Sequence, residues 1–357
     1  MTKRLVLTWV IVMSLALIVF GTSDSEGAGP KKLVFANWLP PMNPVSKGLE
    51  EWAKEFEART GGRYQVDVQS GGVLAGIPQS YDVVASGVAD ISEIITQDVE
   101  KPFPLNDIPA LPFFHRPATD YTKAWFYNVY KKGYLDKEFS DVKILFQFCA
   151  MGEDFLSAKP IRSTADLKGL KVVIGGGPTK AGLMKALGAV GVFGGPPDAY
   201  MMLQKGIADS VFISGLGLKE FHWDEFIHYI IDPLRVGTAV HTVAMNKNTY
   251  MKLPDDVKAI LEDMNADAQI SLKLSASFEN IYQAVIKDYL SSGGGQLIKW
   301  SDEENKKLNL AAADLWKGWI EAQEKKGIPA REAIDAYYNG LKALGDENPA
   351  LGYTAGY

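Results

Sequence analysis

Residues 167–209 read LKGLKVVIGGGPTKAGLMKALGAVGVFGGPPDAYMMLQKGIAD, and the fold class follows from this stretch. An apolar strand over 171–174 leads into a turn of three glycines and a helix over 179–187. A second strand ends at Phe193, and a second helix ends in a glycine-aspartate turn. This order predicts a βαβα unit and therefore an α/β protein.

The glycine turn has two interpretations. Three glycines between a strand and a helix start suggest backbone N–H groups turned toward a ligand, with Gly176 at the centre. The stretch matches neither GxGxxG nor a phosphate-binding P-loop, so a tight turn without a ligand is the alternative.

Length and composition bound the class of protein. A chain of 357 residues is long enough for two domains with separate cores. Hydrophobic residues make up 47% and charged residues 22%, the balance of a soluble globular protein. The net charge of -6, without a basic cluster, argues against nucleic acid as a partner.

The N-terminus predicts export. Lys3 and Arg4 precede a run over 5–20 that is apolar except for Thr8 and Ser14, so residues 1–27 resemble a cleaved signal peptide and the mature chain is expected in the periplasm. An uncleaved membrane anchor is the alternative. The single cysteine, Cys149, lies far from this segment, so neither a lipid anchor nor an intrachain disulfide is expected. Its apolar surroundings predict a buried, inert thiol.

Strands and helices also alternate in the first part of the mature chain, with strands over 32–38, 64–69 and 91–95. This alternation predicts a mostly parallel sheet whose ligand groups lie where strands end. Trp38, Asp90 and Gln97 qualify by position. Core packing of Trp38 and a turn-capping role for Asp90 are the structural alternatives.

Several motifs resemble one family over nearly the whole mature chain. LKGLKV, GGPT, KALGA and DAYMMLQKGIAD occur together with FPLNDIPALPFF at 103–114, SAKPIRSTADLKGLK at 157–171 and NKNTYMKLPDDVKAIL at 246–261. Together they resemble the DctP-type solute-binding subunits of tripartite ATP-independent periplasmic (TRAP) transporters.

The resemblance implies a two-domain periplasmic binding protein fold with an interdomain ligand cleft. Domain I is expected over 31–150 plus 237–277, and domain II over 151–236 plus 278–357, with C-terminal helices. Residues 255–292 contain no glycine or proline, and one helix over them would be about 57 Å long. Such a helix would tie both domains together, as a long helix does in the TRAP family.

The residues that hold a carboxylate in this family are replaced here. The position of its clamping arginine is Val173, and that of a second arginine is Glu153. Phe212, Ile213 and Ser214 occupy the stretch of its asparagine. These departures predict a cleft without its usual cation and a neutral or amine-bearing ligand with an apolar or aromatic portion. The alternative is a monocarboxylate held by a relocated arginine, for which Arg235 is a better candidate than Arg162.

The leading hypothesis is a monomeric periplasmic protein that captures a small organic ligand and delivers it to TRAP membrane subunits. A secreted hydrolase or isomerase using Glu153 and Asp154 is a second hypothesis, although adjacent strand residues face opposite sides. Coupling to an ATP-driven importer or a sensor kinase is a third. The four histidines form no metal pattern, and no metal or cofactor is expected. His241 is interpreted as a core histidine.

Overall fold

The computed structural model describes residues 29–111, 116–176 and 178–345. The expected signal peptide lies outside these ranges. No helix within them combines the length and the apolarity of a membrane span.

One mixed sheet runs through the described part of the chain, in the order β2-β1-β3-β8-β4-β7-β5-β6, with β9 pairing β8. Its first three strands, β1 (Lys31–Ala36), β2 (Tyr64–Gln69) and β3 (Ile91–Ile95), form what we call the first lobe. The second lobe contains β5 (Lys171–Ile174), β6 (Val190–Phe193) and β7 (Ser210–Ile213). Strands pair in parallel within each lobe, as the βα alternation predicts.

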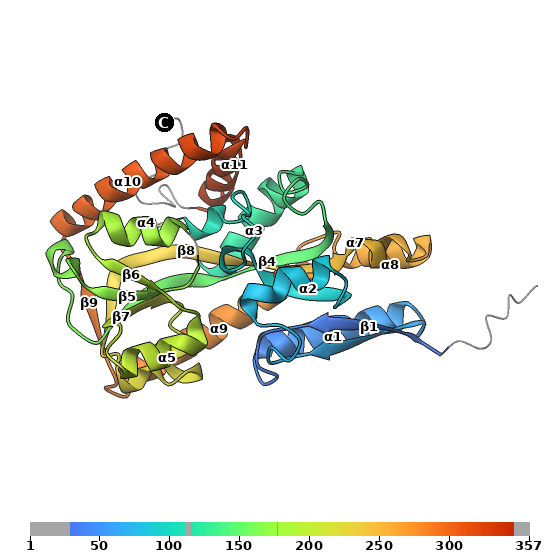
Figure 1. Ribbon diagram of the computed structural model, residues 1–357, viewed down its shortest axis with the longest axis horizontal. Helices are drawn as coiled ribbons and strands as arrows, with labels where there is room; N and C mark the ends of the chain where they lie inside the picture. The colour runs from blue at the N-terminus through green and yellow to red at the C-terminus, as the bar shows by residue number, and fades with distance from the viewer. Residues whose placement is uncertain (1–28, 112–115, 177, 346–357) are drawn as a thin grey trace, which may run out of the picture.

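Two long antiparallel strands, β4 (Val142–Ser157) and β8 (Tyr229–Asn246), join the lobes. Figure 1 shows the first lobe in blue and the second in green toward opposite ends of these strands. Both strands are long, because each continues from one lobe into the other. Their register shifts between Cys149 and Gly152 and again between Asp154 and Phe155, so the ladder is irregular where the lobes meet.

Helices cover both faces of the sheet. In the first lobe these are α1 (Pro44–Arg59) and the short α2 (Ser80–Ala85), and in the second α4 (Pro178–Ala186), α5 (Pro196–Gln204) and α6 (Gly217–Glu220). Helix α3 (Ala118–Asn128) contacts β4. Near the C-terminus, α10 (Asp302–Glu324) packs on α4, and α11 (Ala330–Lys342) packs on α3.

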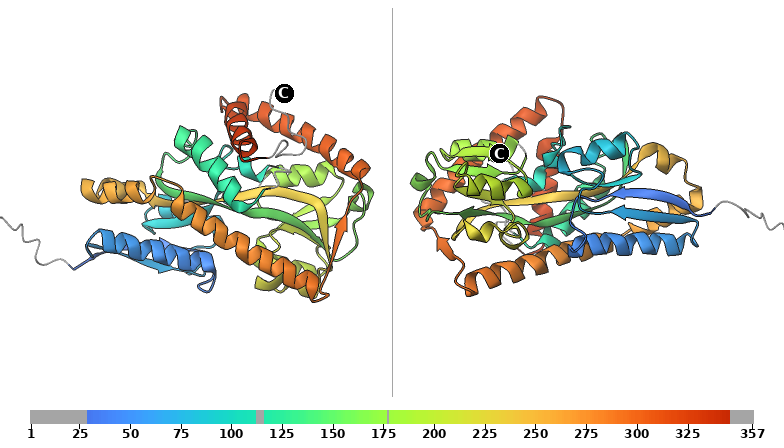
Figure 2. Two further views of the ribbon diagram at one scale, coloured as in Figure 1. Left: turned by 180° about the vertical axis from the view of Figure 1, so that it is seen from behind. Right: turned by 60° about the horizontal axis from the view of Figure 1, so that its bottom comes forward.

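The prediction of one continuous helix over 255–292 is wrong, because the structure has two helices there. After α7 (Lys247–Met251) the chain forms α8 (Asp255–Met264), breaks, and resumes as α9 (Gln269–Ser291). Asn265 ends α8, because its side-chain Nδ2 donates to the Leu261 carbonyl and competes with helix continuation. Helix α9 still spans both lobes: it contacts α1 and α6 as well as β4, and Figure 2 shows it in orange beneath the sheet.

Helix α1 illustrates how the local sequence sets the first lobe. The Asn43 side chain accepts from the Val45 N–H, and Pro44 occupies the first turn, where a missing N–H does no harm. Leu49, Trp52 and Phe56 form a buried stripe at helical spacing. The helix also holds the preceding loop, because Ser46 accepts a hydrogen bond from Asn37 and donates one to the Leu39 carbonyl.

Candidate functional site

A pocket lies between the lobes, where β1, β3, β5 and β7 end beside β4 and β8. The space between its atoms, with open solvent at the mouth included, is about 730 Å³, which is an upper bound on the room for a ligand. The first lobe contributes Trp38, Leu39, Asn43, Ile77, Ile95, Gln97 and Asp98, and the second contributes Gly175, Lys180, Pro196, Ile213, Ser214, Leu216, Gly217, Glu220, Phe221 and Trp223. The crossing strands and α9 add Ala150, Met151, Glu153, Ala239, His241 and Phe278.

Half of the residues proposed from the sequence line this pocket: Trp38, Gln97, Glu153, Ile213 and Ser214. Trp38 and Gln97 follow the ends of β1 and β3, where a parallel sheet exposes its loops. The loop of Trp38 is fixed by Asn37, whose Nδ2 donates to Ser46 Oγ (2.9 Å) and whose Oδ1 accepts from the Leu39 N–H (3.1 Å).

Three proposed residues lie away from the pocket. Asp90 precedes β3 rather than following it, and its carboxylate accepts from the Val34 N–H and the Thr249 hydroxyl, both at 2.9 Å. Val173 is fully buried in a cluster with α5 residues. Phe212 faces the opposite side of β7 from Ile213 and packs on Phe155 at 5.4 Å between ring centroids, because strand residues alternate.

The last two candidates, Gly176 and Arg235, are not among the residues that line the pocket. Gly176 is a neighbour of the pocket, and its backbone N–H donates to the Asp98 carboxylate of the first lobe. Adjacent Gly175 lines the pocket. The backbone of Arg235 lies opposite Asp154 in the β4–β8 ladder, and its side chain falls outside the described part of the structure.

Helix α4 brings a cation that the sequence analysis did not identify, Lys180, into the pocket. Its Nζ lies 3.0 and 2.9 Å from the two carboxylate oxygens of Glu153. The side chains are only 3% and 9% exposed. Burial raises the pKa of Glu153, and the charge and hydrogen bond of Lys180 oppose that shift. The ammonium is therefore already neutralised by the protein.

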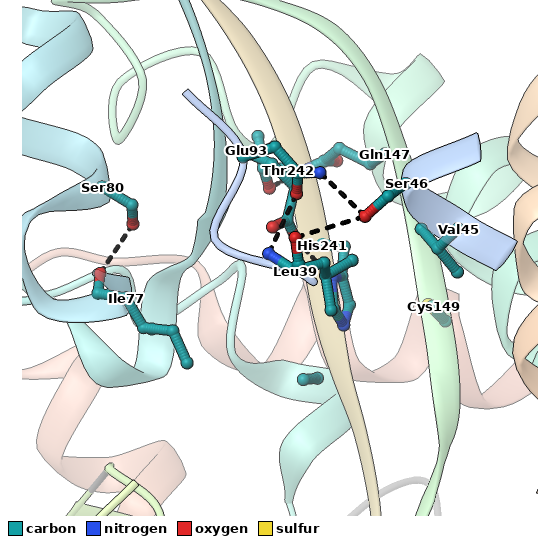
Figure 3. Close-up of polar contacts among 12 residues, drawn as sticks. Leu39, Val45, Ser46, Ile77, Ser80, Glu93, Gln147, Cys149, His241 and Thr242 are labelled. Atoms are coloured by element: carbon teal, nitrogen blue, oxygen red, sulfur yellow. Dashed lines mark hydrogen bonds and ion pairs between the residues drawn. The ribbon is translucent and has the colours of Figure 1, made fainter. Parts of the chain in front are cut away.

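A second buried pair, Glu93 and His241, stands at the first-lobe end of the pocket (Figure 3). His241 Nδ1 lies 2.5 Å from Glu93 Oε1. The ring stacks with Phe148 at 5.0 Å and with Trp38 at 6.3 Å between centroids. The sequence placed His241 in the core; it is buried, but it also lines the pocket, and the distant Glu93 gave no local signal of this pair.

Two carboxylates beside the pocket, Asp98 of the first lobe and Glu220 of the second, each contact the opposite lobe. Asp98 reaches Gly176 across the gap. Part of Glu220 is exposed to solvent, but burial of its carboxyl group raises its pKa, while a hydrogen bond from Asn43 of the first lobe lowers it. The structure thus holds the two lobes in direct contact on two sides of the pocket.

The walls of the pocket are apolar and rich in aromatic rings, with Trp38, Phe221, Trp223 and Phe278 among them. The indole Nε1 atoms of Trp38 and Trp223 are buried without an acceptor among the described residues. Within the same residues, no group of three or more His, Cys, Asp and Glu side chains is placed to hold a metal ion.

Residues 35–323 match the family model of DctP, the bacterial extracellular solute-binding proteins of family 7. The chain belongs to this family. That assignment confirms the resemblance drawn from the sequence motifs.

Known relatives of this DctP-family chain agree over most of its length. Uncharacterized protein YiiZ of Salmonella typhimurium is 23% identical over 336 residues, 92% of each chain. A TRAP solute-binding protein from Rhodoferax ferrireducens, solved with copurified benzoate, is 25% identical with a TM-score of 0.76, covering 87% of this chain and 98% of the other. A TRAP periplasmic solute-binding protein from Desulfovibrio salexigens is 24% identical with a TM-score of 0.77, covering 90% and 98%. The α/β solute-binding fold predicted from the sequence is confirmed.

Proposed function

We propose that this protein captures one small, uncharged or amine-bearing organic solute with an apolar or aromatic body and delivers it to TRAP membrane subunits. The observation that carries the proposal is the pocket between the lobes, in which the Lys180 ammonium is already paired with Glu153. We further propose that an N-terminal signal peptide directs the protein to the periplasm. There it would act as a monomer.

Capture follows from closure of two domains, residues 31–150 with 237–277 and residues 151–236 with 278–357. A ligand between them favours the closed arrangement in proportion to its additional contacts there. The contacts of Asp98 with Gly176 and of Asn43 with Glu220 are the kind that such closure forms.

Charge argues against a dicarboxylate. Burying a carboxylate without a cationic partner costs several kcal/mol, and no arginine is among the described residues that line the pocket. Asp98, Glu153 and Glu220 outnumber Lys180 there. Relatives are named as complexes with mandelate and with pyroglutamate, which are not dicarboxylates. A monocarboxylate is therefore the second candidate.

A thermal-shift screen tests the proposal. Uncharged and amine compounds with an aromatic or aliphatic body should raise the melting temperature, since a ligand at 100 times its Kd adds about 2.7 kcal/mol. Succinate-like diacids should give no shift. Stabilisation by diacids alone would contradict the proposed ligand class, and stabilisation by aromatic monocarboxylates would favour the second candidate.

The same screen addresses the enzymatic alternative. Each stabilising compound is incubated with the purified protein, and the amount that remains unchanged is measured by mass spectrometry. Unchanged recovery is expected of a binding protein. If the native protein converts the compound and the Glu153→Gln variant does not, the result would instead support a hydrolase or isomerase.

A further inference from the structure

We propose that His241, positioned by Glu93, donates a hydrogen bond from Nε2 to an uncharged oxygen acceptor of the ligand, of the amide-carbonyl class. The proposal rests on the proposed function, because it assigns one chemical group of the solute to one end of the same pocket.

The geometry singles out one nitrogen of the ring. Nδ1 of His241 is occupied by Glu93 Oε1 at 2.5 Å, and the two side chains are 4% and 0% exposed. Nε2 has no hydrogen-bond partner among the described residues. Because the residue lines the pocket and its other nitrogen is fixed, Nε2 is the atom that it offers to a ligand.

A ring that carries hydrogen on both nitrogens would make Nε2 a donor. Glu93 is fully buried, and its second oxygen, Oε2, has no partner among the described residues. A buried carboxylate needs a positive charge beside it, and the imidazole in contact with Glu93 supplies one when both ring nitrogens carry hydrogen. Nε2 then bears a hydrogen that requires an acceptor.

The neighbouring tryptophan points to the same ligand chemistry. Trp38 stacks on the His241 ring with an interplanar angle of 24°, and its buried Nε1–H has no acceptor among the described residues. Indole N–H groups donate only, so Trp38 adds no acceptor beside His241. A carboxylate would place a second negative charge across the ring from Glu93, and an ammonium group offers no lone pair. An uncharged oxygen satisfies the Nε2 donor without either conflict.

Three compounds that share one ring distinguish these charge states: benzamide, benzoate and benzylamine. Each is titrated into full-length protein whose histidines carry ¹⁵N in the ring. Benzamide should move the His241 Nε2 signal and should bind at least tenfold more tightly than benzoate or benzylamine. Substituting the other three histidines one at a time assigns the His241 signal by elimination, and the titration itself is made on the native sequence. A His241 signal that benzamide leaves unmoved overturns the proposal.

Variants then separate hydrogen bonding from packing. His241→Phe keeps an aromatic ring and should weaken benzamide binding at least tenfold, whereas His228→Phe, at an exposed position outside the pocket, should not. Glu93→Gln still accepts from Nδ1 but lacks the charge, so it should reduce the preference for benzamide over benzoate. Equal benzamide affinity in His241→Phe refutes the role of His241. If another solute of the screen still stabilises that variant fully, the proposed function stands without it.

Discussion

At the scale of single residues, the pocket contains two buried pairs of ionisable side chains. Lys180 with Glu153 and His241 with Glu93 each bring together segments far apart in the chain. Removing one member of such a pair leaves the other buried and uncompensated, which costs more than removing both.

Lys180→Met tests this balance. Glu153 would remain buried without its cation, and the free energy of unfolding at pH 7 should fall by about 3–5 kcal/mol. The double variant Lys180→Met with Glu153→Gln should recover most of that loss. Urea unfolding of the three proteins measures both effects, and a single variant as stable as the native chain would show that the pair is not coupled.

Asp107 provides a pH-dependent prediction. Burial is the main cause that raises its pKa from 3.8 to about 7, against a hydrogen bond from the Thr96 hydroxyl that lowers it. The protonated form is thus favoured in the folded state, so its contribution to stability declines as the pH rises from about 4 to about 7. Asp107→Asn should be more stable than the native chain at pH 8, by on the order of a few kcal/mol, and similar at pH 4.

Thermal unfolding of both proteins at pH 4 and pH 8 makes the comparison. Since every other titrating group is shared, the difference between the two proteins isolates Asp107. An equal difference at both pH values would contradict the raised pKa.

At the scale of helices and strands, β4 and β8 carry the architecture, because they are the elements of the sheet that enter both lobes. Helix α9 reinforces them from one face. Close packing along β8 is most evident at Gly237, where a Cβ atom would collide with the carbonyl oxygen of Pro109.

Gly237→Ala should therefore destabilise the protein by about 1–3 kcal/mol or more, since a rigid backbone atom must move. Gly318→Ala is the matched control: nothing lies within 4 Å of its added Cβ, and alanine on a helix surface adds about 0.5–1 kcal/mol. Chemical denaturation of both variants gives the comparison. Equal stability of Gly237→Ala and the native chain would mean that the segment around Pro109 adapts.

Local sequence patterns predicted the elements far better than their partners. The strands over 91–95 and 171–174 were predicted with the bounds of β3 and β5, because apolar runs and glycine turns are local signals. Trp38 and Gln97 were found by the rule of strand ends. Lys180 and His241 were missed, since their pairing with Glu153 and Glu93 is created by tertiary contacts. The break between α8 and α9 contains no glycine or proline, so no local signal in the sequence predicts it.

At the scale of the whole molecule, one point where the lobes approach each other is the contact between Asp98 and Gly176. The Asp98 carboxylate accepts from the Gly176 N–H, and a Cβ atom on Gly176 would collide with the Gln97 carbonyl oxygen and with Asp98. The approach of the lobes thus depends on the absence of a side chain at this position.

Gly176→Ala should hold the lobes apart. Affinity for the best solute of the thermal-shift screen should fall at least tenfold, about 1.4 kcal/mol, and small-angle scattering should show a larger radius of gyration with solute present. Gly182→Ala in α4 is the control, because its added Cβ meets only Leu315 Cδ2 at 3.5 Å. If affinity and radius of gyration are unchanged in Gly176→Ala, binding does not depend on the close approach at Gly176.

The position of Cys149 has a practical consequence for observing the protein at work. It is the single cysteine of the chain, it is fully buried in β4, and burial raises the pKa of its thiol, so it resists alkylation. Cysteines introduced at Val73 in the first lobe and Phe193 in the second, 73% and 62% exposed, would then accept a pair of fluorophores without labelling the interior. Energy transfer between those dyes would turn the protein into a reagentless optical sensor for its own solute.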